Sequence, residues 1–126
     1  MGISVVLKSK GKFLLQLRDN KKWIKNPNKW SLFGGGIKNG ESSKEAAIRE
    51  MKEELELDLK ERDLLLISKT KFRKVPHYNF LLKKDILISK LNLQEGQAMK
   101  LFSRKEIIWM KKVTFETKLF FLFHKL

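Results

Sequence analysis

The segment Gly34–Leu57, GGGIKNGESSKEAAIREMKEELEL, decides how this chain folds and where its chemistry lies. It places three glycines before a turn and then gathers six glutamates and one arginine within seventeen residues. Ser42 and Glu45 fit a capping box, and neither proline nor glycine interrupts the sequence from there to Leu55. The segment therefore predicts a glycine-rich loop that leads into a helix from Ser42 to about Leu55.

One face of the predicted helix is apolar, and the opposite face carries converging acids. At about 100° per residue, the expected core face consists of Ala47, Ile48, Met51 and Leu55. Glu50, Glu53 and Glu54 fall on the other side at i, i+3 and i+4 spacing. Like charges at this spacing destabilise a helix by a few tenths of a kcal/mol per pair, and an Arg49–Glu53 pair relieves only part of that.

Carboxylates that converge beside a glycine-rich loop suit a hard divalent cation. Glycine lets backbone groups approach a ligand with no side chain in the way. Carboxylate and carbonyl oxygens together form the kind of site that binds Mg²⁺ or Mn²⁺, and these ions share their coordination with the phosphates of a substrate. The residues thus favour a metal site for a phosphate-bearing substrate, and a solvated acidic helix face is the alternative.

The charge distribution separates the acidic segment from the rest of the chain. Residues 41–58 hold seven acids against three cations, a net charge of −4. The remainder of the 126 residues carries 25 cations against seven acids, a net charge of +18. A basic surface steers phosphate-bearing ligands, so nucleotides, RNA and acidic lipids all fit this composition. The alternative is that the lysines keep the protein soluble.

Composition predicts one globular domain over residues 1–126. A hydrophobic content of 42% with nine Phe is sufficient for a core, and the lack of cysteine excludes disulfides and thiolate metal sites. No apolar run reaches the roughly 18 to 20 residues that span a bilayer. The start, MGISVVLKSKGK, fits neither a signal peptide nor a myristoylation site. We expect a cytoplasmic protein without membrane contact.

The remaining segments mix strand and helix patterns, which predicts an α/β or α+β fold with a mixed sheet. Strand patterns cover residues 3–8, 12–18, 63–72 and 77–88, and a short strand follows a turn at residues 95–96. A second capping box, Ser103 with Glu106, opens a helix that runs through Met110. The tail TFETKLFFLFHKL, residues 114–126, predicts a last and mostly buried helix.

The glycine and glutamate pattern of the opening segment resembles the box of the Nudix hydrolase family, G-x5-E-x7-R-E-U-x-E-E-x-G-U, in which U is apolar. The matching positions are Gly35, Glu41, Arg49, Glu50, Met51, Glu53, Glu54 and Leu57. Six of the seven fixed letters and both apolar positions are present. Chance produces such a match in so short a chain with a probability below about one in a thousand. The chain is therefore identified as similar to minimal, MutT-like members, with its box at residues 35–57.

Two positions depart from the family pattern. Glu56 replaces the second glycine of the box, which ends the helix in a left-handed conformation. A glutamate there either costs about 1 kcal/mol or lets the helix run on. Gly34 replaces a proline that is common before the box. The segment EGQAMKLFS, residues 95–103, is similar to a later family segment whose glutamate, here Glu95, reaches the metal site from a loop.

The resemblance implies a Nudix fold, an α/β/α sandwich with a mixed sheet, and a Mg²⁺-dependent enzyme that can use Mn²⁺ instead. The family hydrolyses nucleoside diphosphates linked to another moiety by attack of water on a phosphorus atom. The implied metal ligands are Gly35 through its carbonyl, Glu50, Glu53, Glu54 and Glu95. Either Glu50 or Glu95 would be the general base. Arg49 would orient the carboxylates through charge-assisted hydrogen bonds, with support from Glu41.

The substrate is less closely defined than the metal site. Arg18 and Lys38 are candidates to contact a phosphate, and Trp30 is a candidate to stack on a base, although it can equally pack under its loop. A minimal chain favours a nucleoside triphosphate, cleaved to a nucleoside monophosphate and pyrophosphate. The alternatives are an NDP-sugar or dinucleoside polyphosphate hydrolase, and a non-catalytic module that binds nucleotides or RNA. RNA is the less favoured partner, and the sequence leaves the oligomeric state open.

Overall fold

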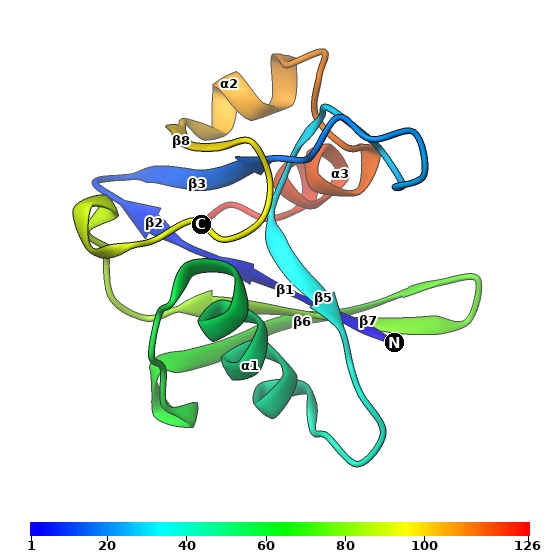
Figure 1. Cartoon of the computed structure of the whole chain (residues 1–126), viewed down its shortest axis with the longest axis vertical. Coiled ribbons are helices and arrows are strands. Elements are labelled where there is room, and N and C mark those ends of the chain that lie inside the picture. The colour runs from blue at the N-terminus through cyan, green and yellow to red at the C-terminus, as the bar shows by residue number, and fades with distance from the viewer.

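The computed structural model describes residues 1–126, apart from the side chain of Phe72, and contains two small sheets and three α-helices (Figure 1). The strands are β1 (Gly2–Val6), β2 (Lys8–Ser9), β3 (Lys12–Leu17), β4 (Trp30–Ser31), β5 (Phe33–Gly36), β6 (Leu64–Phe72), β7 (Val75–Leu82) and β8 (Ala98–Phe102). The helices are α1 (Ser43–Leu55), α2 (Arg104–Trp109) and α3 (Phe115–Phe123), with 3-10 turns at Glu61–Asp63 and Ile88–Lys90.

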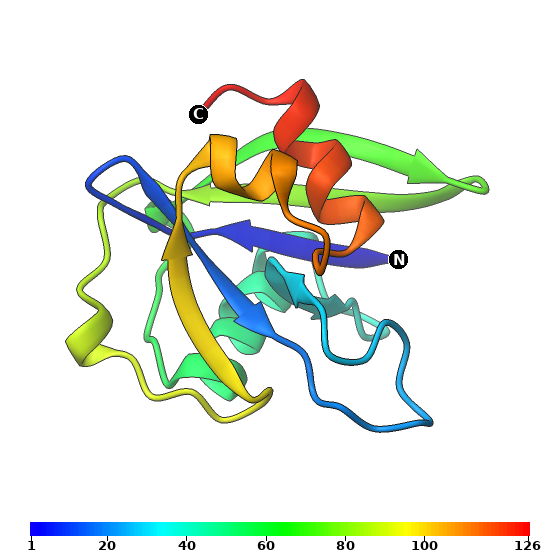
Figure 2. The ribbon, with the colours of Figure 1, turned by 90° about the horizontal axis from the view of Figure 1, so that it is seen from above.

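The first sheet is mixed, as the sequence predicts. Its strand order is β5–β1–β7–β6, in which β1 and β7 run parallel while the other neighbours are antiparallel. The second sheet places β3 between β4 and β8, with β2 at its start, and all of its pairs are antiparallel. Helix α1 covers one side of the first sheet, and α2 and α3 lie on the other side (Figures 1 and 2).

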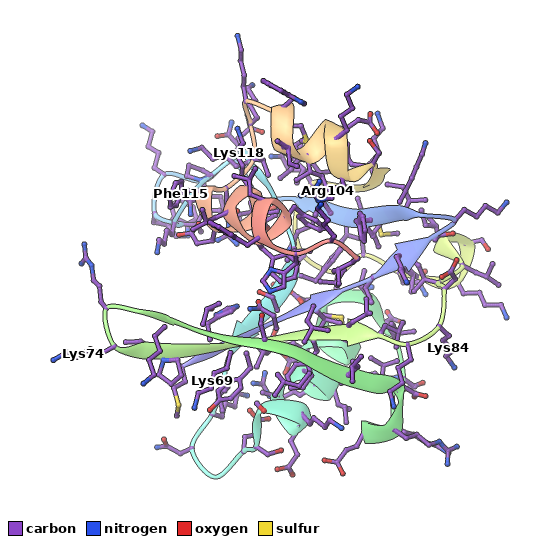
Figure 3. All side chains as sticks on the ribbon, turned by 180° about the vertical axis from the view of Figure 1, so that it is seen from behind. Lys69, Lys74, Lys84, Arg104, Phe115 and Lys118 are labelled. Atoms are coloured by element: carbon purple, nitrogen blue, oxygen red, sulfur yellow. The ribbon has the colours of Figure 1, made fainter. Side chains whose placement is uncertain are left out.

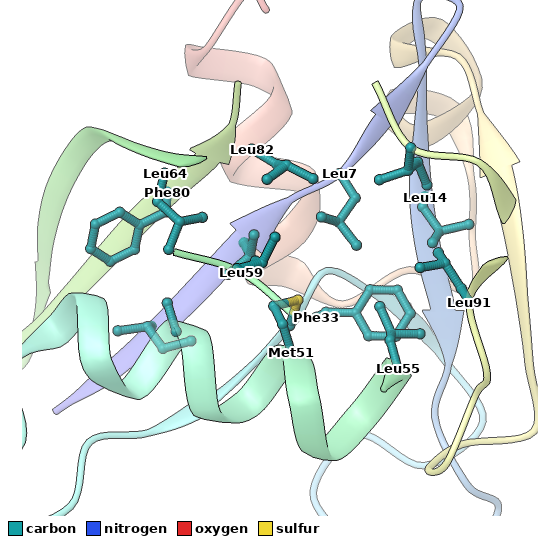
Figure 4. Close-up of a cluster of buried hydrophobic side chains, with 14 of the residues drawn as sticks. Leu7, Leu14, Phe33, Met51, Leu55, Leu59, Leu64, Phe80, Leu82 and Leu91 are labelled. Carbon is teal, nitrogen blue, oxygen red and sulfur yellow. The ribbon is translucent and has the colours of Figure 1, made fainter. Parts of the chain in front are cut away.

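Helix α1 is fixed at its start by its cap and along its length by an apolar face. The Ser42 hydroxyl accepts the Glu45 N–H at 3.1 Å, and the Glu45 carboxylate accepts the Ser42 N–H at 2.9 Å, so the predicted capping box is present. Met51 and Leu55 are fully buried and reach toward Phe33 of β5 (Figure 4). Burial of each such side chain contributes roughly 1.5–3 kcal/mol. The buried residues of α1 are Ala46, Ala47, Met51, Glu54 and Leu55, whereas Ile48 is half-buried.

Helix α1 ends at Leu55 because Glu56 takes a left-handed conformation, with φ 54° and ψ 33°. The Glu56 N–H donates to the Lys52 carbonyl at 3.0 Å, and the Leu57 N–H donates to the Met51 carbonyl at 3.2 Å. The bond from Glu56 to Lys52 is the one that defines an αL helix end, in which glycine normally takes the left-handed position. Of the two predicted outcomes, the strained helix end is therefore correct, and the helix does not run on.

Strand β7 is shorter than the sequence predicts. It ends at Leu82, and the predicted extension through Ile88 is wrong. Three consecutive charged residues, 83–85, interrupt the alternation that a strand requires, and the chain turns there. Ile86 is nevertheless buried because its N–H donates to the Lys8 carbonyl at 2.9 Å, which holds the turn against the sheet.

The prediction of a mostly buried last helix is wrong for half of α3. Phe120 and Phe121 are buried in the second core cluster, and Phe121 packs against Phe13 with ring centroids 4.9 Å apart. Phe115 and Phe123, however, are 68% and 78% exposed. Apolar residues surround this helix, but a helix that lies on the surface buries only one side. Among the described residues, no helix is long and apolar enough to cross a bilayer.

The β6–β7 hairpin extends past the edge of its sheet. The first residue of β1, Gly2, pairs with His77, so residues 71–76 lie beyond the part of β7 that is paired with β1. These residues, which we call the hairpin arm, project beyond the N-terminus in both views (Figures 1 and 2). Arg73 and Lys74 form its tip with positive φ values of 52° and 67°.

Candidate active site

Arg49 gathers three acids of the glutamate-rich segment around one guanidinium group. Its Nε and Nη2 donate to the two oxygens of Glu41 at 2.6 and 3.0 Å. Its Nη1 donates to Glu50 at 2.9 Å and to Glu53 at 3.3 Å, and Nη2 also donates to the Gly36 carbonyl at 2.8 Å. The hydrogen bonds from Arg49 lower the pKa of Glu41 to about 2, and the bond with Glu41 raises the pKa of Arg49. Both groups therefore remain charged at neutral pH.

Glu50 lies directly against the backbone of the glycine-rich strand β5. A Cβ atom at Gly35 would overlap the Glu50 carboxyl group, so this close approach requires glycine. Burial raises the pKa of Glu50, and its hydrogen bond with Arg49 opposes that rise. Gly36 is different, because a Cβ atom there would meet nothing nearer than the Met1 carbonyl at 3.9 Å.

Glu54 is a buried carboxyl group with an oxygen left unpaired. Its side chain is 3% exposed, and Oε2 has no hydrogen-bond partner among the described residues. Burial, together with the charges of Glu50 and Glu95, raises the pKa of Glu54 to about 8. Hydrogen bonding from Gln16 and from the Gly34 backbone lowers it in part. An ionised carboxylate in this position is unfavourable unless a cation compensates it.

Glu54 also corrects the expected arrangement of the helix faces. The sequence places Glu50, Glu53 and Glu54 together opposite the core, but Glu54 lies at the edge of the core beside Leu55. Glu53 is the outward member of the set, with a side chain 48% exposed. The three carboxylates span about 100° of the helix surface, and Glu54 is at the end of that arc, only about 20° from the buried Ala47, so the core covers it.

The acids fit a hard cation by their chemistry, although they are not gathered into a closed set. Among the described residues, no three acidic or histidine side chains converge closely enough to form a metal site by themselves. Arg49 holds Glu50 and Glu53, whereas Glu54 points toward Gln16. The unpaired Glu54 oxygen and the carboxylates beside it are nevertheless the oxygen donors that Mg²⁺ and Mn²⁺ prefer.

Two adjoining hollows open next to these acids. The smaller has a volume of about 190 Å³ and is lined by Glu54, Glu95 and Arg18, among others. The larger is a groove of about 900 Å³ between α3, the hairpin and the glycine-rich strand β5. The two share Gln16, Arg18 and Gly34, so a ligand in the groove can reach Glu54. Figure 3 shows the two sides of this region, with Phe115 and Lys118 on α3 and Lys74 at the end of the hairpin.

The structure brings two of the more distant predicted residues to the acids and leaves two others apart. Arg18 lines both hollows, and its Nε donates to the Lys25 carbonyl at 3.0 Å. Glu95 lies in the smaller hollow, and its charge raises the pKa of Glu50 and Glu54. Lys38 is exposed in the turn before α1, and Trp30 packs edge-on against Phe102 at 4.9 Å. Neither is among the described residues that line the two hollows.

The sequence reasoning missed several polar residues of the groove. Gln16 is buried beside Glu54, and a polar residue flanked by leucines within the strand KFLLQL is the sequence signal that could have identified it. Ser31 is also buried, and its Oγ has no hydrogen-bond partner among the described residues. Asn79 is buried and donates to Ser68 at 2.9 Å. Ser31 and Asn79 carry no signal in the sequence, because the groove forms only when β4 and β7 come together.

Comparison with known proteins agrees with this fold. A model of the NUDIX domain matches residues 2–118. The MutT protein from Methanosarcina mazei Go1 superposes with a TM-score of 0.74 at 22% identity, covering 96% of this chain and 88% of that one. A MutT NUDIX hydrolase from Burkholderia pseudomallei gives 0.76 at 18% identity, covering 96% and 94%.

A third solved structure extends the comparison to a protein with a named reaction. The E. coli dihydroneopterin triphosphate pyrophosphohydrolase superposes with a TM-score of 0.69 at 19% identity, covering 95% of this chain and 90% of that one. No functionally curated protein matches the sequence of this chain. At these identities the structures show the fold, while the domain model spans nearly the whole sequence and includes the glutamate-rich segment. On that ground the chain belongs to the Nudix hydrolase family.

Proposed function

We propose that this Nudix hydrolase is a Mg²⁺-dependent pyrophosphohydrolase that cleaves a nucleoside triphosphate to a nucleoside monophosphate and pyrophosphate. The family hydrolyses nucleoside-diphosphate-linked substrates, and the proposal adds the metal and the class of substrate. The observation that supports it most is the buried Glu54 carboxyl group, whose unpaired oxygen adjoins a groove large enough for a nucleotide. A purely structural role gives no reason to keep such a group.

The proposed metal ligands are the carboxylates of Glu50, Glu53 and Glu54 and the carbonyl of Gly35, with Glu95 as a further candidate. A bound Mg²⁺ or Mn²⁺ neutralises phosphate oxygens and makes a bound water more acidic. Arg49 holds Glu50 and Glu53 in position through its hydrogen bonds. The third carboxylate partner of Arg49, Glu41, is fully ionised at neutral pH and keeps the guanidinium group oriented.

Glu50 is the better placed of the two candidates for the general base. Its pKa is raised by burial, which brings a carboxylate closer to the range in which it accepts a proton efficiently near neutral pH. Its carboxyl group is also held by Arg49 against Gly35. Glu95 is exposed in a loop, where it adds negative charge next to Glu54.

The groove supports a substrate with a planar heterocycle and a chain of phosphates. Phe115, Leu119 and Phe123 supply an apolar wall. Gln16, Ser31 and Asn79 place buried polar groups where they can bond to the edge of a base. Arg18 lies where the groove meets the smaller hollow and is the proposed phosphate contact. The named substrate of the E. coli neighbour, a triphosphate of a pterin, is compatible with a groove of this kind.

A substrate panel with product analysis tests the proposal. Nucleoside triphosphates, NDP-sugars and dinucleoside polyphosphates are incubated with Mg²⁺, and the products are separated by anion exchange. We expect nucleoside triphosphates to give monophosphate and pyrophosphate. Release of orthophosphate, or turnover of NDP-sugars or dinucleotides alone, would contradict the proposed substrate class.

Variants of the acidic helix test the proposed ligands. Glu53→Gln removes one charge from an exposed side chain, and we expect at least a hundredfold lower kcat with an unchanged melting temperature. Glu56→Gln is the matched control, because it lies on the next turn outside the acidic cluster and should leave kcat unchanged. Full Mg²⁺-dependent hydrolysis by the Glu53 variant would overturn the metal assignment.

A further inference from the structure

The hairpin arm carries positive charge that the proposed hydrolysis does not use. No acidic residue occurs in the sequence between Asp63 and Asp85, whereas this stretch holds six cations. Lys71 lines the groove, and Arg73 and Lys74 are exposed at the tip. Residues 71–76 extend past the point where β7 pairs with the first residue of β1, so the ribbon of the arm projects from the body of the protein (Figure 2), and Arg73 and Lys74 form its tip.

The tip of the arm uses residues that disfavour its own conformation. A two-residue hairpin turn with positive φ at both positions normally holds Asn-Gly or Asp-Gly. Here Arg73 and Lys74 occupy the two positions, with φ of 52° and 67°. Side chains with a Cβ are strained in this region, and such strain at an exposed tip points to a role outside folding. Because both strained positions hold cationic side chains, the ligand that they indicate is an anion.

The wall that faces the arm is an aromatic platform. Phe115, Leu119 and Phe123 lie at i, i+4 and i+8 on α3, so they form one stripe along the helix. All three line the groove, and the two phenylalanines are mostly exposed. Exposed aromatic rings beside cations are the combination with which proteins bind single-stranded nucleic acids, because bases stack on the rings and phosphates meet the cations.

The third side of the groove repeats this combination. The loop between β3 and β4 contributes Lys25 and Asn26 to the lining, and its Trp23 is 81% exposed beside Lys21. The described groove lining holds three cations from three different parts of the chain, Arg18, Lys25 and Lys71, against one acid, Glu116. Its volume of about 900 Å³ is near the upper end of the roughly 300–1,000 Å³ of small-molecule sites.

We infer that this groove binds a single-stranded nucleic acid, with bases on Phe115 and Phe123 and phosphates on Lys71, Arg73 and Lys74. An anionic membrane would also meet exposed aromatics and lysines. The groove, however, is hollowed and is lined by the buried Ser31, whose hydroxyl has no hydrogen-bond partner among the described residues and can be satisfied by a nucleotide but not by lipid chains. The inference rests on the proposed function only in that hydrolysis would act on the end of the bound nucleic acid. Binding of the nucleic acid does not itself require hydrolysis.

Binding is measured in EDTA, so that it does not depend on turnover. Fluorescein-labelled oligouridylate and oligothymidylate of about 10 nucleotides, within the usual site size of a single-strand-binding domain, are titrated with the full chain and followed by anisotropy. We expect both oligonucleotides to bind. The ratio of their dissociation constants reports whether the protein distinguishes the RNA from the DNA. Equal affinity for a duplex of the same length would overturn the single-strand assignment, because paired bases cannot stack on the platform.

The double variant Arg73→Asn/Lys74→Gly separates binding from folding. It replaces the strained tip by a favourable turn, so the melting temperature should rise by about 3–5 °C. The loss of two phosphate contacts should weaken oligonucleotide binding about tenfold and reduce the slope of log K against log salt by about 1.4. Arg62→Gln/Lys84→Gln removes the same charge from the opposite end of the hairpin (Lys84 in Figure 3) and should change affinity less than twofold. Equal losses in both double variants would reduce the effect to net charge and overturn the inference.

The aromatic platform is tested in the same assay. Phe115→Ala and Phe123→Ala remove exposed rings, so the fold should persist, and each should weaken binding at least about fivefold. Unchanged affinity in both would overturn the inference, as would binding to phosphatidylserine vesicles without binding to either oligonucleotide.

Glu53→Gln should lose nucleotide hydrolysis and keep oligonucleotide binding. A wild-type protein that hydrolyses nucleotides but binds no oligonucleotide would refute the inference alone, and one that binds without hydrolysing any nucleotide would refute the proposed function alone.

Discussion

Glu54 is the residue at which stability and chemistry are most clearly opposed. Its pKa is raised to about 8 in the folded chain, against an ordinary value of 4.5. The folded state therefore holds this proton more tightly than the unfolded state does. The stabilising contribution of protonated Glu54 is fully present below about pH 4.5 and is lost as the pH rises through about 8. At the upper end of this window the buried charge costs up to a few kcal/mol.

Glu54→Gln should therefore stabilise the protein while it inactivates it. Glutamine keeps the shape of the side chain and cannot ionise, so in EDTA at about pH 8 the melting temperature should exceed that of the wild type by several degrees. Near pH 5 the two proteins should melt at nearly the same temperature, and Mg²⁺ should raise only the wild-type value. Differential scanning calorimetry across this range gives the result. A variant that is less stable at pH 8 would show that the ionised carboxyl group is compensated within the protein.

Glu56 lowers the stability of the protein by a smaller amount at the end of the same helix. A left-handed glutamate costs about 1 kcal/mol relative to glycine, and its side chain lies outside the acidic cluster. Glu56→Gly should raise the free energy of unfolding by about 1 kcal/mol and leave kcat unchanged, as measured by urea denaturation and by turnover. Glu56→Gln keeps the strained backbone and should not stabilise. If both substitutions stabilise equally, the gain comes from removing the charge and not from the backbone.

Strand β5 and helix α1 act as one unit because glycine lets them approach so closely. Gly35→Ala would push a Cβ atom into the Glu50 carboxyl group, so Glu50 must move. A displacement of about 1 Å in a catalytic group can lower the rate about a hundredfold. Gly36→Ala is the matched control on the same strand, because its Cβ would meet only ordinary contacts and its carbonyl still accepts from Arg49. Steady-state kinetics of the two variants, with circular dichroism for folding, separate a positional effect from a general intolerance of β5. Similar activity in both would show that Glu50 tolerates the shift.

The elements that the sequence predicts well are those with local signals. Helix α1 has a capping box and an i,i+4 spacing of Arg49 and Glu53, so its start and this contact follow from residues near in sequence, whereas Glu56 left the position of its end open. The burial of Glu54 depends on Gln16 and Gly34, which reach it from other strands, and no local pattern records this. For the same reason the exposure of Phe115 and the groove beside it could not be predicted. Such features arise from which side of a helix the sheet happens to cover.

The molecule as a whole surrounds a small acidic site with a basic surface. The net charge of +14 attracts polyphosphates from a distance, while the acids at Glu50, Glu53 and Glu54 repel them until a cation is present. Long-range attraction of this kind is screened over about 8 Å at physiological ionic strength, whereas contacts inside the groove are screened much less. The charge of the surface should therefore act mainly on the rate of association and not on the chemical step.

Salt dependence of the kinetics tests this division. Between about 0.05 and 0.5 M KCl, kcat/KM for a nucleoside triphosphate should fall about tenfold, while kcat at saturating substrate should change little. Free Mg²⁺ is held constant, and the melting temperature is followed over the same range to exclude unfolding. A charge-neutral additive such as sucrose at equal osmolality should not reproduce the loss. A flat kcat/KM would mean that the lysines serve solubility, and a parallel fall in kcat would mean that salt displaces the metal or the substrate from the acids themselves.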